Sequence, residues 1–522
     1  SPLLVLFGGV AASTITKLST LNARELWLDE TRSAFFATLP LRDLFRYSLG
    51  DTAPPLYHAL LWIWVRLVGS TQAELRLMSV LLSVLGILCM LFAARAWLGT
   101  RWDSAFAALL LAFSPTLYVY SLEVRQYMLA LCCVTAILII HKKVAGESLV
   151  TKGNLLVYCL LATLLFYSHY VGLFILSGLM VDWLVACRLQ TKRLLAFCAA
   201  AVVVFLATSP WFAIMFRQRD LTLSVYTAQS ASISDPTSLA FGSPILRTPL
   251  REEFVTVAQN VAAAAGVFPT GRGALLVILA VPLVAVLAGI AALVIRGDRT
   301  CRMVAWALLL PSLGLFGLGM SATRYLVPLV PLIILAMCRV LQCWMENKRW
   351  RAAALVTGSL LLLIYIAGFV RHASVRYPKP WHSLVAAVQP AYRQGDILLF
   401  DVLYGQVPFD YAAQQVGFKP REDGFPETIY HWWERQPVKI WGGPVLREAD
   451  LESTIQRAIA TSTTNTVWLI LSDISYYDPR DLLLARFKER GDAVEVYEQS
   501  SKATATLPVD KGLRLVRIAI RR

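Results

Sequence analysis

Runs of apolar residues long enough to cross a lipid bilayer dominate the first 370 residues of this 522-residue chain. A spanning helix needs about 17–25 apolar residues, because the hydrocarbon core is about 30 Å thick. Eleven such runs occur, near residues 3–19, 73–98, 102–119, 125–143, 153–168, 170–187, 192–215, 274–296, 300–320, 325–343 and 351–370. With 57% hydrophobic and 16% charged residues, they predict a polytopic α-helical membrane protein of about 11–13 transmembrane helices.

Five basic clusters between these runs predict the orientation of the chain, because cytoplasmic loops are enriched in Lys and Arg. The clusters are Arg95/Arg101, His141–Lys143 with Lys152, Arg188/Lys192/Arg193, Arg296/Arg299/Arg302 and Lys348/Arg349/Arg351. All five face the cytoplasm only if residues 54–68 do not cross. This segment has about fourteen residues and is rich in Trp and Tyr, so we interpret it as an interfacial helix at the outer face. The first run lacks a basic leader and a cleavage site, so we expect it to be retained.

The net charge of +15 belongs to the membrane part of the chain. Residues 371–522 contain 20 Lys and Arg and 18 Asp and Glu, which leaves 29 and 16 for residues 1–370. A basic surplus confined to the loops of a membrane region indicates inside-facing loops, and we expect no nucleic-acid partner.

Residues 371–522 have the composition of a soluble domain. Predicted strands (396–400, 466–471, 493–497 and 513–520) alternate with predicted helices (405–415, 451–460 and 479–490). This alternation predicts a small α/β domain. Eleven spans with an internal N-terminus place it on the outer face. All nine cysteines lie between Cys89 and Cys343, so neither disulfides nor a Cys-rich zinc site are expected there. We expect it to wall a cavity or help select an acceptor.

The membrane domain, residues 1–370, contains two large predicted outer loops. Residues 20–72 form the first, with juxtamembrane helices. Residues 217–272 form the second, and a loop of this length is usually functional or disordered. It is compatible with a lid over an outer cavity and equally with a passive connector.

Ionisable residues collect on the predicted outer face, beginning with Asp29, Glu30 and Arg32 directly after the first run. The others are Asp51, His58, Glu74, Arg76, Glu123, Arg125, His169 and Arg324. Any one of them is more often a snorkelling or packing residue than a site residue. Charges near hydrocarbon are costly, however, and so many on one face predict a functional site.

Six segments resemble the GT-C membrane glycosyltransferases, in the branch of the protein O-mannosyltransferases and the lipid A aminoarabinose transferases. In order they are Asp29–Glu30, Asp51–Tyr57, Leu75–Ser79, Tyr120–Tyr127 (an S-x-E-x-R-x-Y segment), Ser168–Gly172 and Arg324–Pro331. Each is short, but the ordered set covers residues 27–331. Family members often have a basic residue before the Pro-Pro pair, where this chain has Ala53. If that residue holds the lipid phosphate in the family, we expect Arg32, His58 or Arg125 to hold it here.

The resemblance implies transfer of a sugar from a polyprenyl-phosphate carrier to an acceptor lipid, glycan or protein, outside a bacterial-type inner membrane. A carboxylate suits the general base, and cations suit the leaving phosphate. We assign Asp29 as the general base and Glu30 as its acceptor-orienting neighbour. A single base opposite the leaving group implies inversion at the anomeric carbon. The assigned phosphate ligands are Arg32, His58, Arg125 and Arg324, and the other cavity residues are Asp51, Tyr57, Arg76, Glu123, Tyr127, His169 and Tyr325.

No cofactor is required by this chemistry, although two adjacent carboxylates leave a divalent metal open. Two other classes also fit a multi-span chain. A transporter or flippase usually has internal repeats and mid-membrane charges, and we find no second copy of the Asp-Glu or Pro-Pro segment. A non-catalytic scaffold would not need the ordered motifs. The sequence does not specify the sugar or the acceptor.

Overall fold

The computed structural model describes residues 2–49, 51, 53–146, 150–188, 190–233, 273–317, 323–375, 379–401, 403–425, 427–431, 448–472, 481–498 and 513–521. The chain divides into two compact units. Unit 1 comprises residues 1–22, 53–212 and 247–375, and unit 2 comprises residues 23–52, 213–246 and 376–522. The segment 23–52, which we expected within the membrane domain, thus groups with the C-terminal residues.

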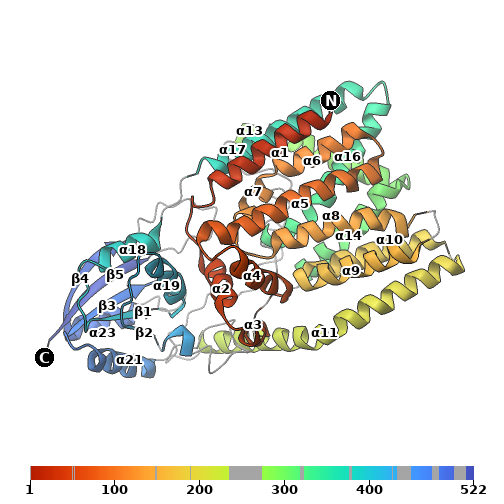
Figure 1. The fold of residues 1–522 in the computed structure, drawn as a ribbon. Coiled ribbons are helices and arrows are strands. Elements are labelled where there is room, and N and C mark those ends of the chain that lie inside the picture. The colour runs from red at the N-terminus through yellow and green to blue at the C-terminus, as the bar shows by residue number, and fades with distance from the viewer. Residues whose placement is uncertain are drawn as a thin grey trace. The chain divides into compact units, whose positions relative to one another are not determined.

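Unit 1 is helical throughout its described part (Figure 1). Its elements are α1 (Pro2–Ser19), α4 (Leu56–Leu67), α5 (Gln72–Leu98), α6 (Arg101–Ala112), α7 (Pro115–Ser121), α8 (Tyr127–Val144), α9 (Lys152–Ser168), α10 (Val171–Cys187), the first half of α11 (Thr191–Ile233), α13 (Gly273–Ile295), α14 (Arg299–Gly317), α15 (Thr323–Leu326), the 3-10 turn η1 (Val327–Leu329), α16 (Val330–Glu346) and α17 (Arg351–Ala373).

Several helices in the described residues are long and apolar enough to span a membrane, as the sequence predicted. Six described helices meet the length and hydropathy expected of a span, or seven if the bent pair α6 and α7 is one span. Four shorter apolar helices accompany them, including α4, α9 and α10. With 12 residues, α4 is about 18 Å long, too short to cross the hydrocarbon core alone.

Local signals in the sequence set the ends of these helices. Thr71 begins α5 with a capping box, in which Glu74 N donates to Thr71 Oγ1 and Thr71 N donates to Glu74 Oε2 at 2.8 Å. Gly99 ends α5 with a φ of 82°, which favours glycine. Ser114 and Pro115 start α7 directly after α6 and bend the pair by 53°. Glu74, one of the outer-face charges, therefore has a structural role.

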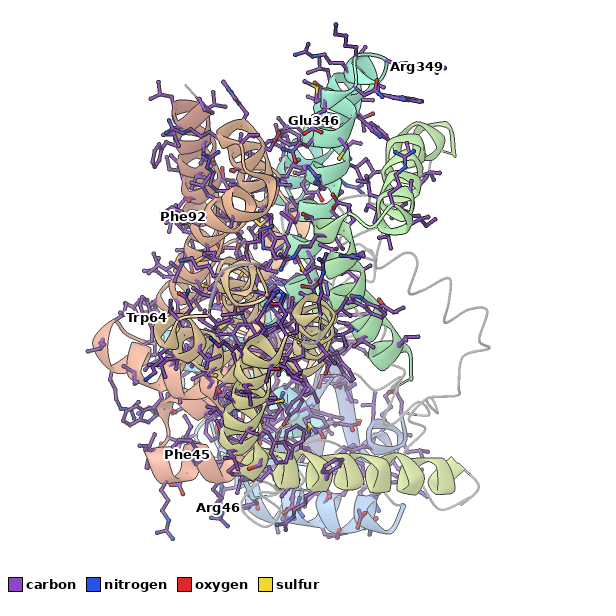
Figure 2. All side chains as sticks on the ribbon, turned by 90° about the vertical axis from the view of Figure 1, so that its right-hand side faces the viewer. Phe45, Arg46, Trp64, Phe92, Glu346 and Arg349 are labelled. Atoms are coloured by element: carbon purple, nitrogen blue, oxygen red, sulfur yellow. The ribbon has the colours of Figure 1, made fainter. Side chains whose placement is uncertain are left out.

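Many large apolar side chains of unit 1 point outward. Phe92 on α5 is 60% exposed, and Leu156 on α9 is 70% exposed; Figure 2 shows Phe92 directed away from the helices, whereas Glu346 and Arg349 lie at the end of α16. Exposed apolar side chains on helices of this hydropathy fit contact with lipid.

Unit 2 contains a five-stranded sheet in the order β2-β1-β3-β5-β4. Its elements are α2 (Leu28–Thr38), α3 (Leu41–Ser48), α18 (Pro380–Val388), β1 (Ile397–Asp401), the turn η2 (Leu403–Gly405), α19 (Gln406–Gln415), β2 (Glu422–Gly424), α21 (Glu448–Thr461), β3 (Thr466–Leu471), α23 (Leu482–Arg490), β4 (Gly491–Glu498) and β5 (Arg514–Ile520). Strands β2, β1 and β3 are parallel, and β5 is antiparallel to both of its neighbours.

Both faces of this sheet are covered by helices. Along β1, Ile397 and Leu399 pack with residues of α21 and α23, whereas Leu398 and Phe400 pack with residues of α18 and α19. A strand buried on both faces reads as a continuous apolar run, as Ile397–Phe400 does. The predicted C-terminal α/β domain is confirmed.

The second large loop lies largely outside the described residues. Helix α11 continues from Thr191 to Ile233, so the polar stretch that we expected to begin a loop at residue 217 is helical in its first part. The lid interpretation concerns residues beyond 233 and falls outside the described ranges.

Two acidic side chains of unit 2 lie close together at the edge of the sheet. Gln406 Nε2 donates to Glu422 Oε2 at 2.8 Å, and Tyr430 donates to Asp410 Oδ2 at 2.5 Å. Burial and the neighbouring Asp410 raise the pKa of Glu422 to about 9. Burial also raises the pKa of Asp410. At neutral pH Glu422 therefore holds a proton in the folded protein.

Glu422→Gln is expected to stabilise unit 2 at high pH. A carboxyl whose folded pKa lies above its unfolded value destabilises the fold increasingly as pH rises from about 4.5 to about 9. Gln cannot ionise, so hydrogen exchange of β1 and β2 should be slower than in the wild type at pH 8.5 and similar at pH 4.5. If the variant and the wild type exchanged at the same rate at pH 8.5 as well as at pH 4.5, the protonated state of Glu422 would be contradicted.

Candidate functional site

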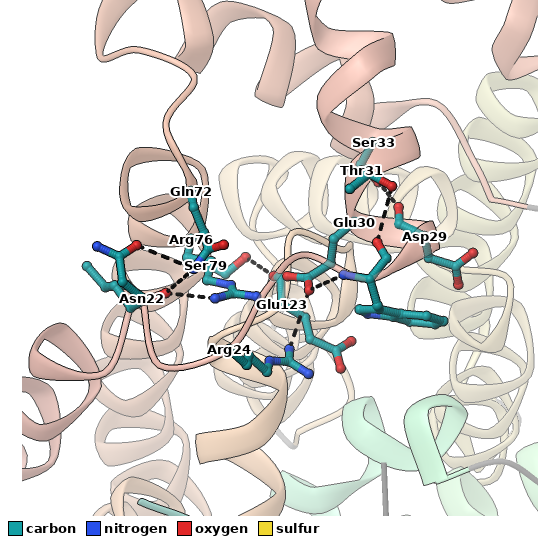
Figure 3. Close-up of polar contacts among 12 residues, drawn as sticks. Asn22, Arg24, Asp29, Glu30, Thr31, Ser33, Gln72, Arg76, Ser79 and Glu123 are labelled. Carbon is teal, nitrogen blue, oxygen red and sulfur yellow. Dashed lines mark hydrogen bonds and ion pairs between the residues drawn. The ribbon is translucent and has the colours of Figure 1, made fainter. Parts of the chain in front are cut away.

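The first turn of α2 gives its two adjacent carboxylates different environments (Figure 3). Glu30 has a fully buried side chain, accepts a hydrogen bond from Trp27 N at 3.3 Å and lies 3.7 Å from Arg24 Nη2. Asp29 keeps 18% side-chain exposure. Glu30 therefore caps the helix on which Asp29 is displayed, and Asp29 is the more accessible carboxylate.

Arg32 joins Asp29 to a second acidic residue. Its Nη2 atom lies 3.4 Å from Asp29 Oδ1 and 3.2 Å from Asp51 Oδ1. The Asp51 side chain is fully buried, and Arg32 is 9% exposed. Arg32 thus orients Asp29 from one turn along α2. Two carboxylates therefore lie beside this guanidinium, and the role of phosphate ligand stays a prediction for Arg32.

Two contacts within unit 2 hold the segment that carries Asp29 against the α/β domain. Glu25 accepts from Trp381 N at 2.9 Å and from His382 N at 2.8 Å, and it also contacts His382 Nδ1. It therefore satisfies the free N–H groups that begin α18.

An aromatic cluster forms the second contact. Phe36 on α2 is fully buried with Leu403, Val407 and Ile429. Its ring stacks on Tyr47 at 5.8 Å, and the neighbouring ring of Phe35 lies 5.3 Å from Tyr430. The position of Asp29 within unit 2 therefore depends on residues more than 350 positions away in the sequence.

Unit 1 contains a separate basic and aromatic group around His169. The His169 ring lies 5.9 Å from the Tyr127 ring and 6.1 Å from the Tyr325 ring. Burial, and then the charges of Arg125 and Arg324, lower the pKa of His169 to about 3. Arg125 is 4% exposed. The structure thus brings five predicted residues, from three separated segments, into one electropositive group.

The remaining predicted residues of unit 1 are also buried. Arg76 Nη1 donates to Leu21 O at 2.7 Å, which ties α5 to the chain after α1. Glu123 is 2% exposed, and its carbonyl oxygen accepts from Ser79 Oγ at 2.6 Å. Tyr57 and His58 lie in the first turn of α4, both at most 1% exposed, with ring centroids 6.0 Å apart.

The predicted residues therefore lie in both units: those around Asp29 are in unit 2, and the His169 group and the remaining residues are in unit 1. Sequence reasoning missed Arg24 and Glu25, which pair with Glu30 and with α18. Two charged residues just after an apolar span are a signal that was present in the sequence. In the part of the chain that the structure describes, no three His, Cys, Asp or Glu residues are grouped so that they could hold a metal ion.

Comparison with known proteins identifies the fold. Residues 52–214 match the profile of the dolichyl-phosphate-mannose-protein mannosyltransferase family. No curated protein matches the sequence.

Two kinds of solved structure are similar over nearly the whole chain. ArnT from Cupriavidus metallidurans, bound to undecaprenyl phosphate, superposes with a TM-score of 0.58 at 14% identity, over 98% of this chain and 97% of that chain. The apo state of the same protein gives the same score and identity over 98% and 96%. The Archaeoglobus fulgidus oligosaccharyltransferase with Zn and sulfate gives 0.54 at 11% identity, over 97% and 72%.

These similarities confirm the resemblance predicted from the ordered motifs. This chain has the GT-C fold of the membrane glycosyltransferases, and its residues 52–214 match the dolichyl-phosphate-mannose-protein mannosyltransferase family.

Proposed function

We propose that this chain transfers a sugar from a polyprenyl-phosphate carrier to an acceptor lipid, glycan or protein at the extracytoplasmic face of the membrane. The observation that carries the proposal is the group around His169, where Arg125 and Arg324 concentrate positive charge beside aromatic rings. Guanidinium groups match phosphate by charge and by their planar pairs of donors, and Arg125 is buried. A relative of the same fold, ArnT, has been solved with undecaprenyl phosphate.

In the proposed reaction Asp29 is the general base. The acceptor O–H or N–H gives its proton to Asp29 as the acceptor atom bonds to the anomeric carbon. The bond from that carbon to the carrier phosphate breaks, and its electron pair leaves with the phosphate. Arg125 and Arg324 stabilise the resulting anion. One base acting opposite one leaving group inverts the anomeric carbon, and the step consumes no metal or redox cofactor.

The donor is tested with the purified full chain in proteoliposomes. We expect label to move from one member of a panel of polyprenyl-phosphate sugars to the acceptor, with release of one polyprenyl phosphate per sugar transferred. Labelled nucleotide sugars should give no product, and activity should persist in EDTA. Direct use of a nucleotide sugar would overturn the proposed donor, and loss in EDTA that Mg²⁺ restores would overturn the metal-independent mechanism.

The face of the membrane is tested with single cysteines in a variant from which the nine free cysteines have been removed. Arg46, Ser70 and Trp102 are exposed and are suitable positions. An impermeant thiol reagent applied to intact cells should label R46C and S70C, and label W102C only after permeabilisation. Protection of S70C with labelling of W102C would mean that residues 54–68 cross the membrane.

A further inference from the structure

His169 occupies the junction between two helices of unit 1. It follows the last residue of α9, and its backbone is extended, with a φ of −159°. His169 N donates to Leu165 O at 3.2 Å, and Gly172 N donates to His169 O at 2.8 Å. Both backbone polar groups of His169 are therefore hydrogen-bonded, and these bonds fix the backbone at the junction. The residue is 4% exposed.

The hydrogen bonds of the ring define its tautomer. Val171 N donates to His169 Nδ1 at 3.1 Å. A ring nitrogen that accepts from a backbone N–H carries no proton, so the proton of a neutral ring must lie on Nε2. In the described residues, this buried Nε2 has no hydrogen-bond partner. A buried donor without a partner is costly and is normally satisfied by another group, by water or by a ligand.

The surroundings of this donor favour an anion. The rings of Tyr127 and Tyr325 flank the imidazole, and Arg125 and Arg324 are the charged groups whose fields act on it. Burial and these two charges keep the ring neutral at pH 7, because they lower its pKa to about 3. A neutral ring adds a directed N–H beside two cations without adding a third positive charge, which would repel them.

We propose that His169 is a positioning residue whose neutral Nε2–H donates to a phosphate oxygen of the polyprenyl-phosphate carrier, between Arg125 and Arg324. This inference rests on the proposed function, because it takes the carrier phosphate as the ligand. The two arginines attract the phosphate by their charge, and the N–H of His169 orients it. Its fixed tautomer restricts the phosphate to rotations that present an oxygen to Nε2. This selects among the phosphate's orientations, and with them the direction in which the anomeric bond leaves.

Two substitutions separate the two nitrogens of the ring. In His169→Asn, the amide oxygen can accept from Val171 N in place of Nδ1, but no donor reaches the position of Nε2. In His169→Gln, the amide nitrogen can reach the position of Nε2 and donate. Loss of a hydrogen bond to a charged group corresponds to roughly ten- to a hundredfold in affinity. Structural damage alone would affect Gln at least as much as Asn.

The test is titration of the full chain in detergent with undecaprenyl phosphate, followed by native mass spectrometry. We expect His169→Asn to raise the Kd roughly ten- to a hundredfold and His169→Gln to stay within about threefold of the wild type. The ratio of the wild-type Kd to that of His169→Gln should be constant from pH 6 to 8.5, because the phosphate titrates equally in both.

Each other outcome overturns a defined part of the inference. Wild-type affinity in His169→Asn would show that the Nε2–H does not bind the carrier. Stronger binding of the wild type relative to His169→Gln toward pH 6 would show that the ring binds as an imidazolium. Failure of the wild type itself to bind undecaprenyl phosphate would instead overturn the donor class of the proposed function.

Discussion

Asp29→Asn is expected to lower the turnover of sugar transfer by roughly 10²–10⁴-fold while leaving the fold and carrier binding unchanged. The amide cannot take the acceptor proton, but its oxygen can still accept from Arg32, which lies 3.4 Å from Asp29 Oδ1 in the wild type. Helix α2 should therefore keep its capping by Glu30. Turnover is measured with the purified variant, and the Kd for undecaprenyl phosphate is measured alongside.

Asp43→Asn is the matched control for Asp29→Asn. Asp43 is also an aspartate in the first turn of a short helix of unit 2, α3, and it lies outside the proposed machinery. We expect its turnover to match the wild type. Normal turnover in Asp29→Asn would remove Asp29 from the mechanism, and an equal loss in both variants would attribute the effect to the stability of the segment.

Phe36→Ala is expected to have the largest effect on stability. Phe36 is fully buried between α2 and residues of α19 and η2, and its ring stacks on Tyr47. Truncation of a buried Phe typically costs about 3–5 kcal/mol, since the transfer free energy is lost and a cavity remains. This is a large fraction of the roughly 5–15 kcal/mol by which folded domains are stable. We expect α2 and α3 to lose hydrogen-exchange protection and transfer to fall with them.

Phe45→Ala provides the control for Phe36→Ala, because Phe45 on α3 is 45% exposed and points outward (Figure 2). Its removal should leave exchange of residues 28–48 unchanged. If Phe36→Ala also left that exchange unchanged, the aromatic cluster would not be what holds α2 to the α/β domain.

The secondary structure of the α/β domain was largely predictable, because its patterns are local. Residues Thr466–Leu471 form β3 as expected, since a fully apolar run of six between polar turns has few alternatives to a buried strand. Strand β2 was missed. Its three residues, Glu422–Gly424, are mostly polar and are extended because they pair with β1, which no local pattern records.

The membrane helices were predictable as apolar helices, but the bend within one of the predicted spans was not. Residues 102–119 read as one apolar span, and the structure bends them by 53° between α6 and α7. The signal was Ser114 followed by Pro115, a common start of a helix, which hydropathy averaged over a window hides.

The sequence identified candidate site residues, and it did not give their contacts. The pair Asp29–Glu30 was identified from the sequence, but only the contacts of Glu30 with Trp27 N and Arg24 show which carboxylate is structural. Likewise the sequence predicted His169 as a cavity residue, and the proton of a neutral ring is assigned to Nε2 because Val171 N donates to Nδ1.

The contact between Glu25 and α18 can form only late in the synthesis of this protein. Glu25 and Trp381 are separated by 356 positions, and chains are made at about 5–20 residues per second, so α18 follows Glu25 by about 20–70 s. Throughout that interval α2 has been made, but the C-terminal residues of α18, η2 and α19 that hold it have not. A nascent chain therefore carries Asp29 in a segment without its final support, and a ribosome that stalls before residue 380 leaves the proposed base without its contacts to α18. Completion of the last quarter of the chain thus coincides with completion of the proposed catalytic group.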